Sequence, residues 1–354
     1  MKTPFLKVFL GFAVASTIFL AACGDDGSDG LPSAPQSSAD ISVPTSSSDA
    51  TVPPSSGVEP VSQAGDPLES SSSAADVVLP ESSSDVVEVP PQGDGYTPGT
   101  LEEEIAKDAP FVDASAVNDT LVPVADLLAS LQPTDRVIFV LRHARRGSST
   151  GRETPLHNTG VNQAQSLGAA IAAVNATDPI FYAHSDYVRT QQTAQNIFVG
   201  RGGDASQFTS TIVSKLAGGG YVKDSDLLAA HAEEDFETNQ IQTFANWMYN
   251  GVYTDAFNDL TETSVAFLTQ YILPAFPKEY RIGIMISHDM TIAPLVAYCT
   301  KLSVNFRAHE NLDNWLGYVQ GLAIVIAADG SRKYFPVNGL YGQYAYLDGA
   351  KNRS

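Results

Sequence analysis

The sequence predicts an α/β fold with three layers, in which helices cover both faces of a mostly parallel central sheet. Three short runs of consecutive apolar residues are typical of strands buried on both faces. A segment with helical periodicity follows each run, and this alternation favours right-handed crossovers between parallel strands. Each run ends in a polar cluster that contains His or Arg. Because ligands collect at the carboxyl ends of parallel strands, the sequence predicts a binding site at that edge.

The N-terminal segment has the pattern of an export signal. Lys2 and Lys7 precede an apolar run over 8–20, which is too short to span a bilayer. The sequence Leu20-Ala21-Ala22-Cys23 resembles the bacterial lipobox, in which the cysteine is lipidated. We therefore expect residues 1–23 to be a lipoprotein signal peptide ending at a lipidated Cys23. The protein would then be an exported bacterial membrane lipoprotein, at the outer membrane or the cell surface.

The next segment lacks the residues needed for a core. Residues 24–100 contain 13 acidic residues, no Lys or Arg, and runs of Ser and Pro. A chain of this composition cannot bury enough apolar surface to offset its conformational entropy. We predict a disordered Ser/Pro/Asp-rich tether over 24–109. The formal net charge of -20 also argues against nucleic-acid binding.

The remaining residues, 110–354, are predicted to form one domain. The expected strands are 136–141, 179–183 and 281–286, followed near the end by 321–328 and 333–337 joined by a turn at Asp329-Gly330. The expected helices are 158–174, 190–198 and 291–302. Residues 200–277 are predicted to form a helical lid or side wall. Cys299 lies in an apolar stretch and is interpreted as a buried small hydrophobic residue.

The first polar cluster, Arg142-His143-Ala144-Arg145-Arg146, suits phosphate chemistry. The planar guanidinium of arginine meets phosphate oxygens with paired hydrogen bonds. A neutral imidazole nitrogen can attack phosphorus, while nearby positive charge stabilises the transition state. A basic loop that pairs with an acidic surface is the alternative interpretation of this segment alone.

Two further clusters are predicted at the same edge. Arg189 lies near the start of a helix, where a positive charge is unfavourable unless an anion binds there. His288 directly follows an apolar strand, with Asp289 beside it. Each has a simpler interpretation, a surface ion pair for Arg189 and an ordinary core histidine for His288, but their convergence with His143 favours one phosphate site.

These clusters resemble the histidine phosphatase superfamily, which has the phosphoglycerate-mutase-like fold. The likeness extends from about Arg136 to Ala297 and rests on four segments in the family's order and spacing. They are Arg142-His143-Ala144, Leu156 to Ala164, Ser185 to Ala194 through Arg189 and Thr193, and His288. Arg146 and Asp289 make the likeness closer to the acid-phosphatase branch. Ala144 stands where the family has Gly, so the approach of that backbone to a ligand differs from the family pattern.

The resemblance implies a role for each matching residue. His143 would be the nucleophile, forming a phosphohistidine, and Arg142, Arg146, Arg189 and His288 would bind phosphate. Asp289 would protonate the leaving group, with Glu233 and Glu234 as the alternative donors. The implied substrate is a small-molecule phosphomonoester, and we expect a monomer without a metal or cofactor. The alternatives are a catalytically inactive, surface-tethered phosphate- or phosphosugar-binding module on this fold, and a phosphoglycerate-type mutase.

Overall fold

The computed structural model describes residues 96–107, 121–236, 239–310, 314–339 and 345–346. The predicted signal peptide, Cys23 and most of the predicted tether lie outside these residues. Within the described part of the chain, no helix is both long and apolar enough to cross a bilayer.

Seven strands form the main sheet, in the order β1-β8-β7-β2-β5-β3-β4. All neighbouring strands are parallel except those next to β7, which runs antiparallel to β2 and β8. The prediction of a mostly parallel sheet is therefore confirmed. The strands are β1 (Val122–Pro123), β2 (Arg136–Arg142), β3 (Ile180–His184), β4 (Thr211–Ile212), β5 (Ile282–Ser287), β7 (Gln320–Ile326) and β8 (Arg332–Asn338), and a second small sheet joins β6 (Asn314–Trp315) to β9 (Ala345–Tyr346).

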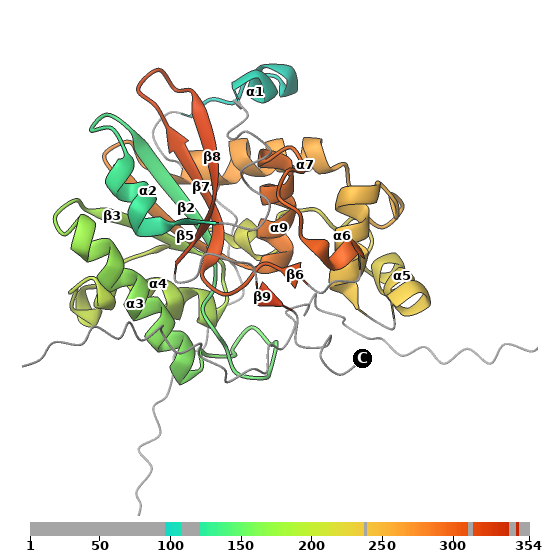
Figure 1. Ribbon diagram of the computed structural model, residues 1–354, viewed down its shortest axis with the longest axis horizontal. Helices are drawn as coiled ribbons and strands as arrows, with labels where there is room; N and C mark the ends of the chain where they lie inside the picture. The colour runs from blue at the N-terminus through green and yellow to red at the C-terminus, as the bar shows by residue number, and fades with distance from the viewer. Residues whose placement is uncertain (1–95, 108–120, 237–238, 311–313, 340–344, 347–354) are drawn as a thin grey trace, which may run out of the picture. The chain divides into compact units, whose positions relative to one another are not determined.

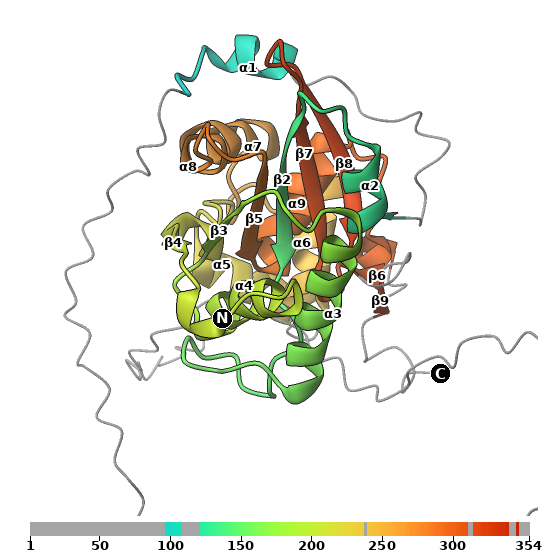
Figure 2. The ribbon, with the colours of Figure 1, turned by 90° about the vertical axis from the view of Figure 1, so that its left-hand side faces the viewer.

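Helices cover both faces of the main sheet (Figure 1). Side chains alternate between the faces along β2: Val137 and Phe139 pack with helices α2, α3 and α4, whereas Ile138 and Val140 pack with α6 and α9. Figure 2 shows the same layers from the side. The α-helices are α1 (Leu101–Lys107), α2 (Val124–Ser130), α3 (Asn158–Val174), α4 (Val188–Gly200), α5 (Ser225–Phe236), α6 (Gln240–Asn250), α7 (Leu260–Phe267), α8 (Leu273–Ala275) and α9 (Asp289–Cys299). Short 3₁₀ helices are η2 (Ala205–Gln207), η3 (Ser214–Ala217) and η5 (Arg307–Glu310), and η4 (Leu268–Ile272) is a π-helix between α7 and α8.

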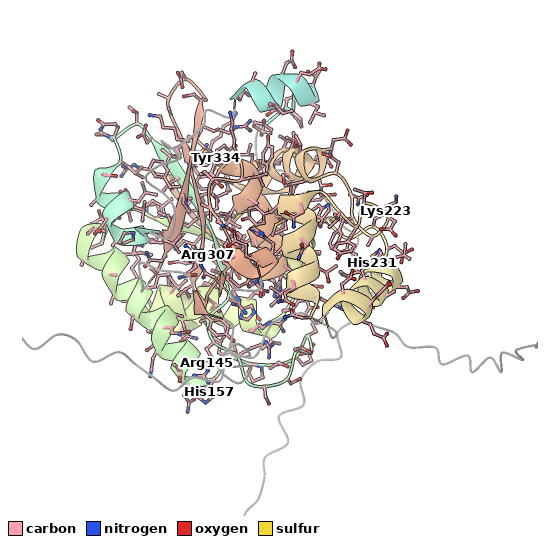
Figure 3. All side chains as sticks on the ribbon, turned by 45° about the vertical axis from the view of Figure 1, so that its right-hand side comes forward. Arg145, His157, Lys223, His231, Arg307 and Tyr334 are labelled. Atoms are coloured by element: carbon pink, nitrogen blue, oxygen red, sulfur yellow. The ribbon has the colours of Figure 1, made fainter. Side chains whose placement is uncertain are left out.

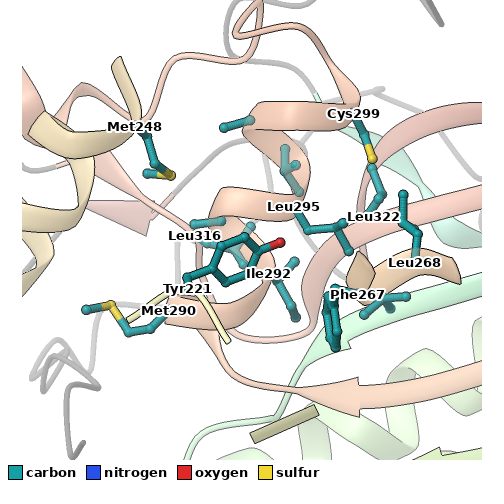
Figure 4. Packing of buried hydrophobic residues seen from close by; sticks show 14 of the residues in the cluster. Tyr221, Met248, Phe267, Leu268, Met290, Ile292, Leu295, Cys299, Leu316 and Leu322 are labelled. Carbon is teal, nitrogen blue, oxygen red and sulfur yellow. The ribbon is translucent and has the colours of Figure 1, made fainter. Parts of the chain in front are cut away.

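Helix α9 lies in the larger of the two apolar clusters. Leu295 and Cys299 of this helix pack among side chains from α6, α7 and β7 (Figure 4). Cys299 is buried, as predicted. Segment 200–277, predicted to be a helical lid or side wall, contains the helices α5, α6, α7, η4 and α8. Of these elements, α6 and α7 pack directly against α9, the helix that begins directly after His288.

Close helix packing explains two glycines between the first two long helices. A Cβ at Gly168 of α3 would lie 2.1 Å from the carbonyl oxygen of Ile197, and one at Gly200 would lie 2.1 Å from that of Gln165. Any side chain at these positions would force α3 and α4 apart. This contact fixes α4, which carries Arg189, against α3.

Residues 96–107 belong to the folded unit although they fall within the predicted tether. Glu104 of α1 and Arg332 of β8 form a buried ion pair with an O–N distance of 3.2 Å. The hydroxyl of Tyr96 also donates to Glu104. The structure thus differs from the predicted boundary at residue 110, because the sequence pattern did not show that a single glutamate in an acidic segment has a buried arginine partner.

Candidate active site

The predicted site residues meet at the carboxyl edge of three adjacent parallel strands. Strand β5 lies between β2 and β3, and each of the three strands ends one residue later than predicted. His143 therefore follows β2 and His288 follows β5. The backbone N–H of His143 donates to the carbonyl of Ser287 at 2.9 Å, which extends the pairing of the strands. The two histidines are brought together by the sheet itself rather than by a flexible loop.

The two imidazoles lie next to each other inside the protein. Their ring centroids are 5.3 Å apart. His143 is 0% exposed and His288 is 5% exposed. Arg189 contacts both rings: its Nε donates to Nε2 of His143 at 3.2 Å, and its Nη2 donates to Nδ1 of His288 at 3.4 Å. The structure therefore places the Arg189 guanidinium in contact with both histidines.

The surroundings of His143 keep its ring neutral. Its Nδ1 contacts the carbonyl oxygen of Ala144 at 2.8 Å, and since a carbonyl only accepts, Nδ1 carries the hydrogen. Burial lowers the pKa of His143 well below its usual value, and electrostatic interactions with His288, Arg142 and Arg189 lower it further. Nε2 therefore carries no hydrogen at neutral pH, and its lone pair accepts the hydrogen bond from Arg189.

The pKa of His288 is lowered in the same way. Burial is the main cause, and the charges of Arg189, Arg142 and Arg146 add to it. Both histidines are thus neutral while several guanidinium groups supply the positive charge of the site.

Arg142, the last residue of β2, is held by partners on two sides. Its Nη2 lies 3.3 Å from Oδ2 of Asp289, and its Nη1 donates to the carbonyl of Leu316 at 2.6 Å. Its guanidinium also lies over the ring of Tyr318, 4.4 Å from the centroid. Arg142 is only 1% exposed. Such a fixed guanidinium provides a charge that need not reorganise when an anion binds.

Arg146 organises the loop that follows the first histidine. Its Nη1 donates to the carbonyls of Gly147, Ser148 and Ser149 at 2.8, 3.2 and 2.6 Å. The Nη1 of Arg189 donates in turn to the carbonyl of Gly151 at 2.9 Å. The Nη1 groups of Arg146 and Arg189 therefore hold the backbone of this loop in place.

Ala144 is accommodated without the backbone conformation that would need glycine. Its φ is not positive, its side chain is buried, and its N–H donates to Oγ1 of Thr193 at 3.0 Å. The family glycine is thus replaced without strain. Close approach occurs instead at Gly160, where a Cβ would lie 1.9 Å from the carbonyl oxygen of Arg145. Figure 3 shows Arg145 and His157 at this junction, where the N–H of His157 donates to the carbonyl of Arg145 at 2.9 Å.

The candidate proton donors lie in very different places. Asp289 is fully buried beside His288, and its Oδ2 accepts a hydrogen bond from Nε1 of Trp315 at 3.2 Å as well as contacting Arg142. Glu233 and Glu234 are exposed on α5, which packs on α6 at the edge of the helical layer in Figure 1. His231 on the same helix marks this edge in Figure 3. The structure brings Asp289, but not the two glutamates, to the histidines.

Three aromatic residues at the site were not singled out from the sequence. Tyr187 lies against His288 with centroids 4.7 Å apart, Tyr318 lies 5.8 Å from His143, and Trp315 contacts Asp289. Tyr187 belongs to the second polar cluster, so its position was within reach of the sequence pattern. Trp315 and Tyr318 follow 311–313, between predicted elements, and no periodicity marks them.

The comparisons with known proteins assign this domain to a family. The model of the histidine phosphatase superfamily (branch 1) matches residues 138–316, about half of the chain, so the protein belongs to this superfamily. The match starts in β2 and ends just after Trp315. It therefore includes every residue of the predicted site within the folded domain.

Several solved structures are similar at low sequence identity. A mycobacterial hydrolase is 16% identical with a TM-score of 0.36, over 60% of this chain and 100% of that chain. A mycobacterial glucosyl-3-phosphoglycerate phosphatase is 14% identical with a TM-score of 0.33, over 60% and 99% of the two chains. The protein histidine phosphatase SixA, complexed with tungstate, is 12% identical with a TM-score of 0.30, over 57% and 97%. No curated protein matches the sequence.

Among the described residues, no group of three or more His, Cys, Asp or Glu side chains is arranged to hold a metal ion.

Proposed function

We propose that this protein is a phosphomonoester hydrolase that acts through a phosphohistidine on His143. The observation that carries the proposal is the position of Arg189, whose guanidinium donates to both site imidazoles in a buried layer. A phosphoryl group that replaces these contacts would meet a neutral nucleophilic nitrogen and fixed positive charge together. Family membership supports the same chemistry.

The proposed reaction has two steps. In the first, Nε2 of His143 forms a bond to phosphorus while the bond to the leaving oxygen breaks, and Asp289 gives that oxygen a proton. In the second, water attacks the phosphohistidine, Asp289 takes a proton from it, and the phosphate leaves with the nitrogen–phosphorus bond broken. Arg142, Arg146 and Arg189 balance the charge of the phosphoryl oxygens.

The histidine itself provides the test of this function. His143→Ala removes the nucleophile, so it should abolish turnover of an aryl phosphate such as 4-nitrophenyl phosphate. The matched control is His157→Asn, since His157 accepts a hydrogen bond as the N-cap of α3 and Asn serves equally well there. Full activity of His143→Ala would remove the proposal. Tight phosphate binding by the unaltered protein without any turnover would instead indicate a binding module.

We also propose that Cys23 carries a lipid that anchors the exported protein and that the acidic segment after it acts as a tether. The support is the sequence pattern alone. Cys23→Ala should move the protein from the membrane to the soluble fraction and abolish labelling by a palmitate analogue. Unchanged membrane retention of Cys23→Ala would contradict the proposal.

A further inference from the structure

The hydrogen bonds around His288 determine which ring nitrogen carries its hydrogen. Nε2 lies 3.0 Å from Oγ of Ser185, and Nδ1 lies 3.4 Å from Nη2 of Arg189. A guanidinium has only hydrogens to offer, so Nδ1 must present its lone pair to Arg189. The hydrogen of the neutral ring is then on Nε2, and Ser185 must accept it.

A second, independent chain of contacts leads to the same assignment. Thr190 Oγ1 lies 2.7 Å from the carbonyl oxygen of Tyr187 and 3.0 Å from that of Ser185, and both are acceptors. The single hydroxyl hydrogen of Thr190 is therefore given to a carbonyl. Ser185 Oγ lies 2.9 Å from Thr190 Oγ1, so the hydrogen between them belongs to Ser185. With its own hydrogen used, Ser185 can only accept from His288.

These contacts are sealed from water. Ser185 and Thr190 are both 0% exposed, and His288 is 5% exposed. Since a buried polar group without a partner is costly, neither hydroxyl can rotate to another acceptor cheaply. The backbone of Ser185 is also fixed, because its N–H donates to the carbonyl of Ile286 in the sheet at 3.1 Å.

We propose that Ser185, with its hydrogen held by Thr190, is a positioning residue that locks His288 in the Nε2–H tautomer and directs the Nδ1 lone pair at the phosphate-binding position. His143 is fixed in the opposite sense, with its hydrogen on Nδ1 and its lone pair on Nε2. The two rings thus turn their unprotonated nitrogens toward the same guanidinium.

The tautomer has a consequence for substrate binding that rests on the proposed hydrolase function. An unprotonated phosphate oxygen only accepts hydrogen bonds, so it can bond to Nδ1 only if that nitrogen gains a proton. A monoester monoanion brings one: the proton leaves its P–OH oxygen and joins Nδ1, which leaves the dianion beside an imidazolium. The ionisable groups around this ring, taken from every element that faces it, are Arg142, His143, Arg146, Tyr187, Arg189 and Asp289.

The ring-nitrogen ¹⁵N NMR spectrum of the free protein tests the assignment directly. We expect His288 to show a protonated Nε2 and an unprotonated Nδ1 at neutral pH. A protonated Nδ1, or a rapidly averaged pair, would overturn the proposal. This measurement needs no catalysis, so it stands whether or not the protein hydrolyses phosphomonoesters.

Two nearly isosteric variants test the role of the hydroxyls. Ser185→Ala removes the acceptor, and Thr190→Val leaves the Ser185 hydrogen free to be donated to Nε2. Both should make the Nδ1–H form of His288 visible in the spectrum, and Ser185→Ala should lower kcat by about tenfold, with a smaller change in KM. Thr190→Val keeps the test open should Ser185→Ala fail to fold.

The control is Ser287→Ala, because Ser287 is equally buried and adjacent to His288 but donates to the carbonyl of Leu216 at 2.6 Å, away from the ring. It should leave the His288 spectrum unchanged. If Ser185→Ala and Thr190→Val also leave the spectrum unchanged, the positioning role is refuted. Changed spectra in a protein without any turnover would retain the lock and refute the hydrolase.

Discussion

The Nε of Arg189 donates a hydrogen bond to Nε2 of His143, the atom that we propose attacks phosphorus, across 3.2 Å. The bond holds the nucleophilic lone pair toward the place where an anion would bind. It also means that substrate must take over these donors from the histidines as it enters. In the proposed mechanism Arg189 therefore has two roles: it orients the two histidines, and it receives the phosphoryl oxygens.

Removing the charge of Arg189 should impair catalysis and shift its pH dependence. We expect Arg189→Gln to lower kcat/KM by about 10²–10³-fold, because a fixed donor to the transition state is lost. The charge of Arg189 lowers the pKa of His143, so its loss raises that pKa. His143 is then protonated over more of the acid range, and the acid limb of the kcat/KM profile should move to higher pH.

Arg152→Gln provides the control for this prediction. Arg152 pairs with Asp186 across 2.6 Å, and its side chain is 51% exposed. The variant therefore removes one positive charge that lies outside the buried layer of the site. Its pH profile should match that of the unaltered protein. An acid limb that stays in place in Arg189→Gln would show that Arg189 does not set the protonation of the nucleophile.

Asp289 should matter most for substrates whose leaving group needs a proton. Asp289→Asn should reduce turnover of an alkyl phosphate by about 10²–10⁴-fold and that of 4-nitrophenyl phosphate much less, because nitrophenolate leaves readily without protonation. The comparison of the two substrates within one variant is the measurement. An equal loss for both would assign Asp289 to holding Arg142 rather than to proton transfer.

Glu233→Gln and Glu234→Gln complete the comparison, since these residues were the alternative donors. Both side chains are exposed on α5, so both variants should retain the activity and leaving-group dependence of the unaltered protein. Trp315→Phe removes a hydrogen bond to Asp289 but keeps the carboxyl group. It should therefore lower activity less than Asp289→Asn does.

The strands and the three site clusters were predictable because each depends on short-range pattern. An apolar run of five or six residues indicates a buried strand, and the polar residues that end it must lie at one edge when the strands are parallel. Val137 and Ile138 illustrate the burial of such a strand on both faces, since they pack into opposite layers of the fold. The position of His143 next to His288 follows from the same rule.

Contacts that segments outside the strand ends make with the site could not be predicted. The carbonyl of Leu316 and the indole of Trp315 reach the site because the segment before β7 passes over Arg142 and Asp289. Neither residue carries a local signal of that path. The choice between Asp289 and the glutamates of α5 likewise required knowledge of where the helical side wall lies relative to the strand ends.

The ion pair between α1 and β8 should make stability depend on pH. Burial raises the pKa of Glu104, but hydrogen bonds from Lys107, Tyr96 and the Gly99 N–H, with the charge of Arg332, outweigh it and lower the pKa from 4.5 to about 2. The unfolded chain therefore takes up a proton near pH 4.5 before the folded one does. This stabilisation is complete above pH 4.5 and is lost as the pH falls through 2.

Urea unfolding measures this contribution. Glu104→Gln should lower the free energy of unfolding at pH 7 by about 3 kcal/mol, and the difference from the unaltered protein should shrink steadily below pH 4.5. Glu102→Gln is the control, because Glu102 is exposed on the same helix. A Glu104→Gln effect that is the same at pH 7 and pH 3 would mean that the charge of this carboxylate contributes nothing.

The central claim, that His143 carries the phosphoryl group, is tested most directly by trapping the intermediate. The protein is mixed rapidly with 4-nitrophenyl phosphate, quenched in alkali, where phosphohistidine survives, and digested for peptide mass spectrometry. We predict one phosphoryl group on the peptide that contains His143 and none on the peptide that contains His288. A phosphoryl group on any other residue, or steady turnover with His143 unmodified throughout, would contradict the account.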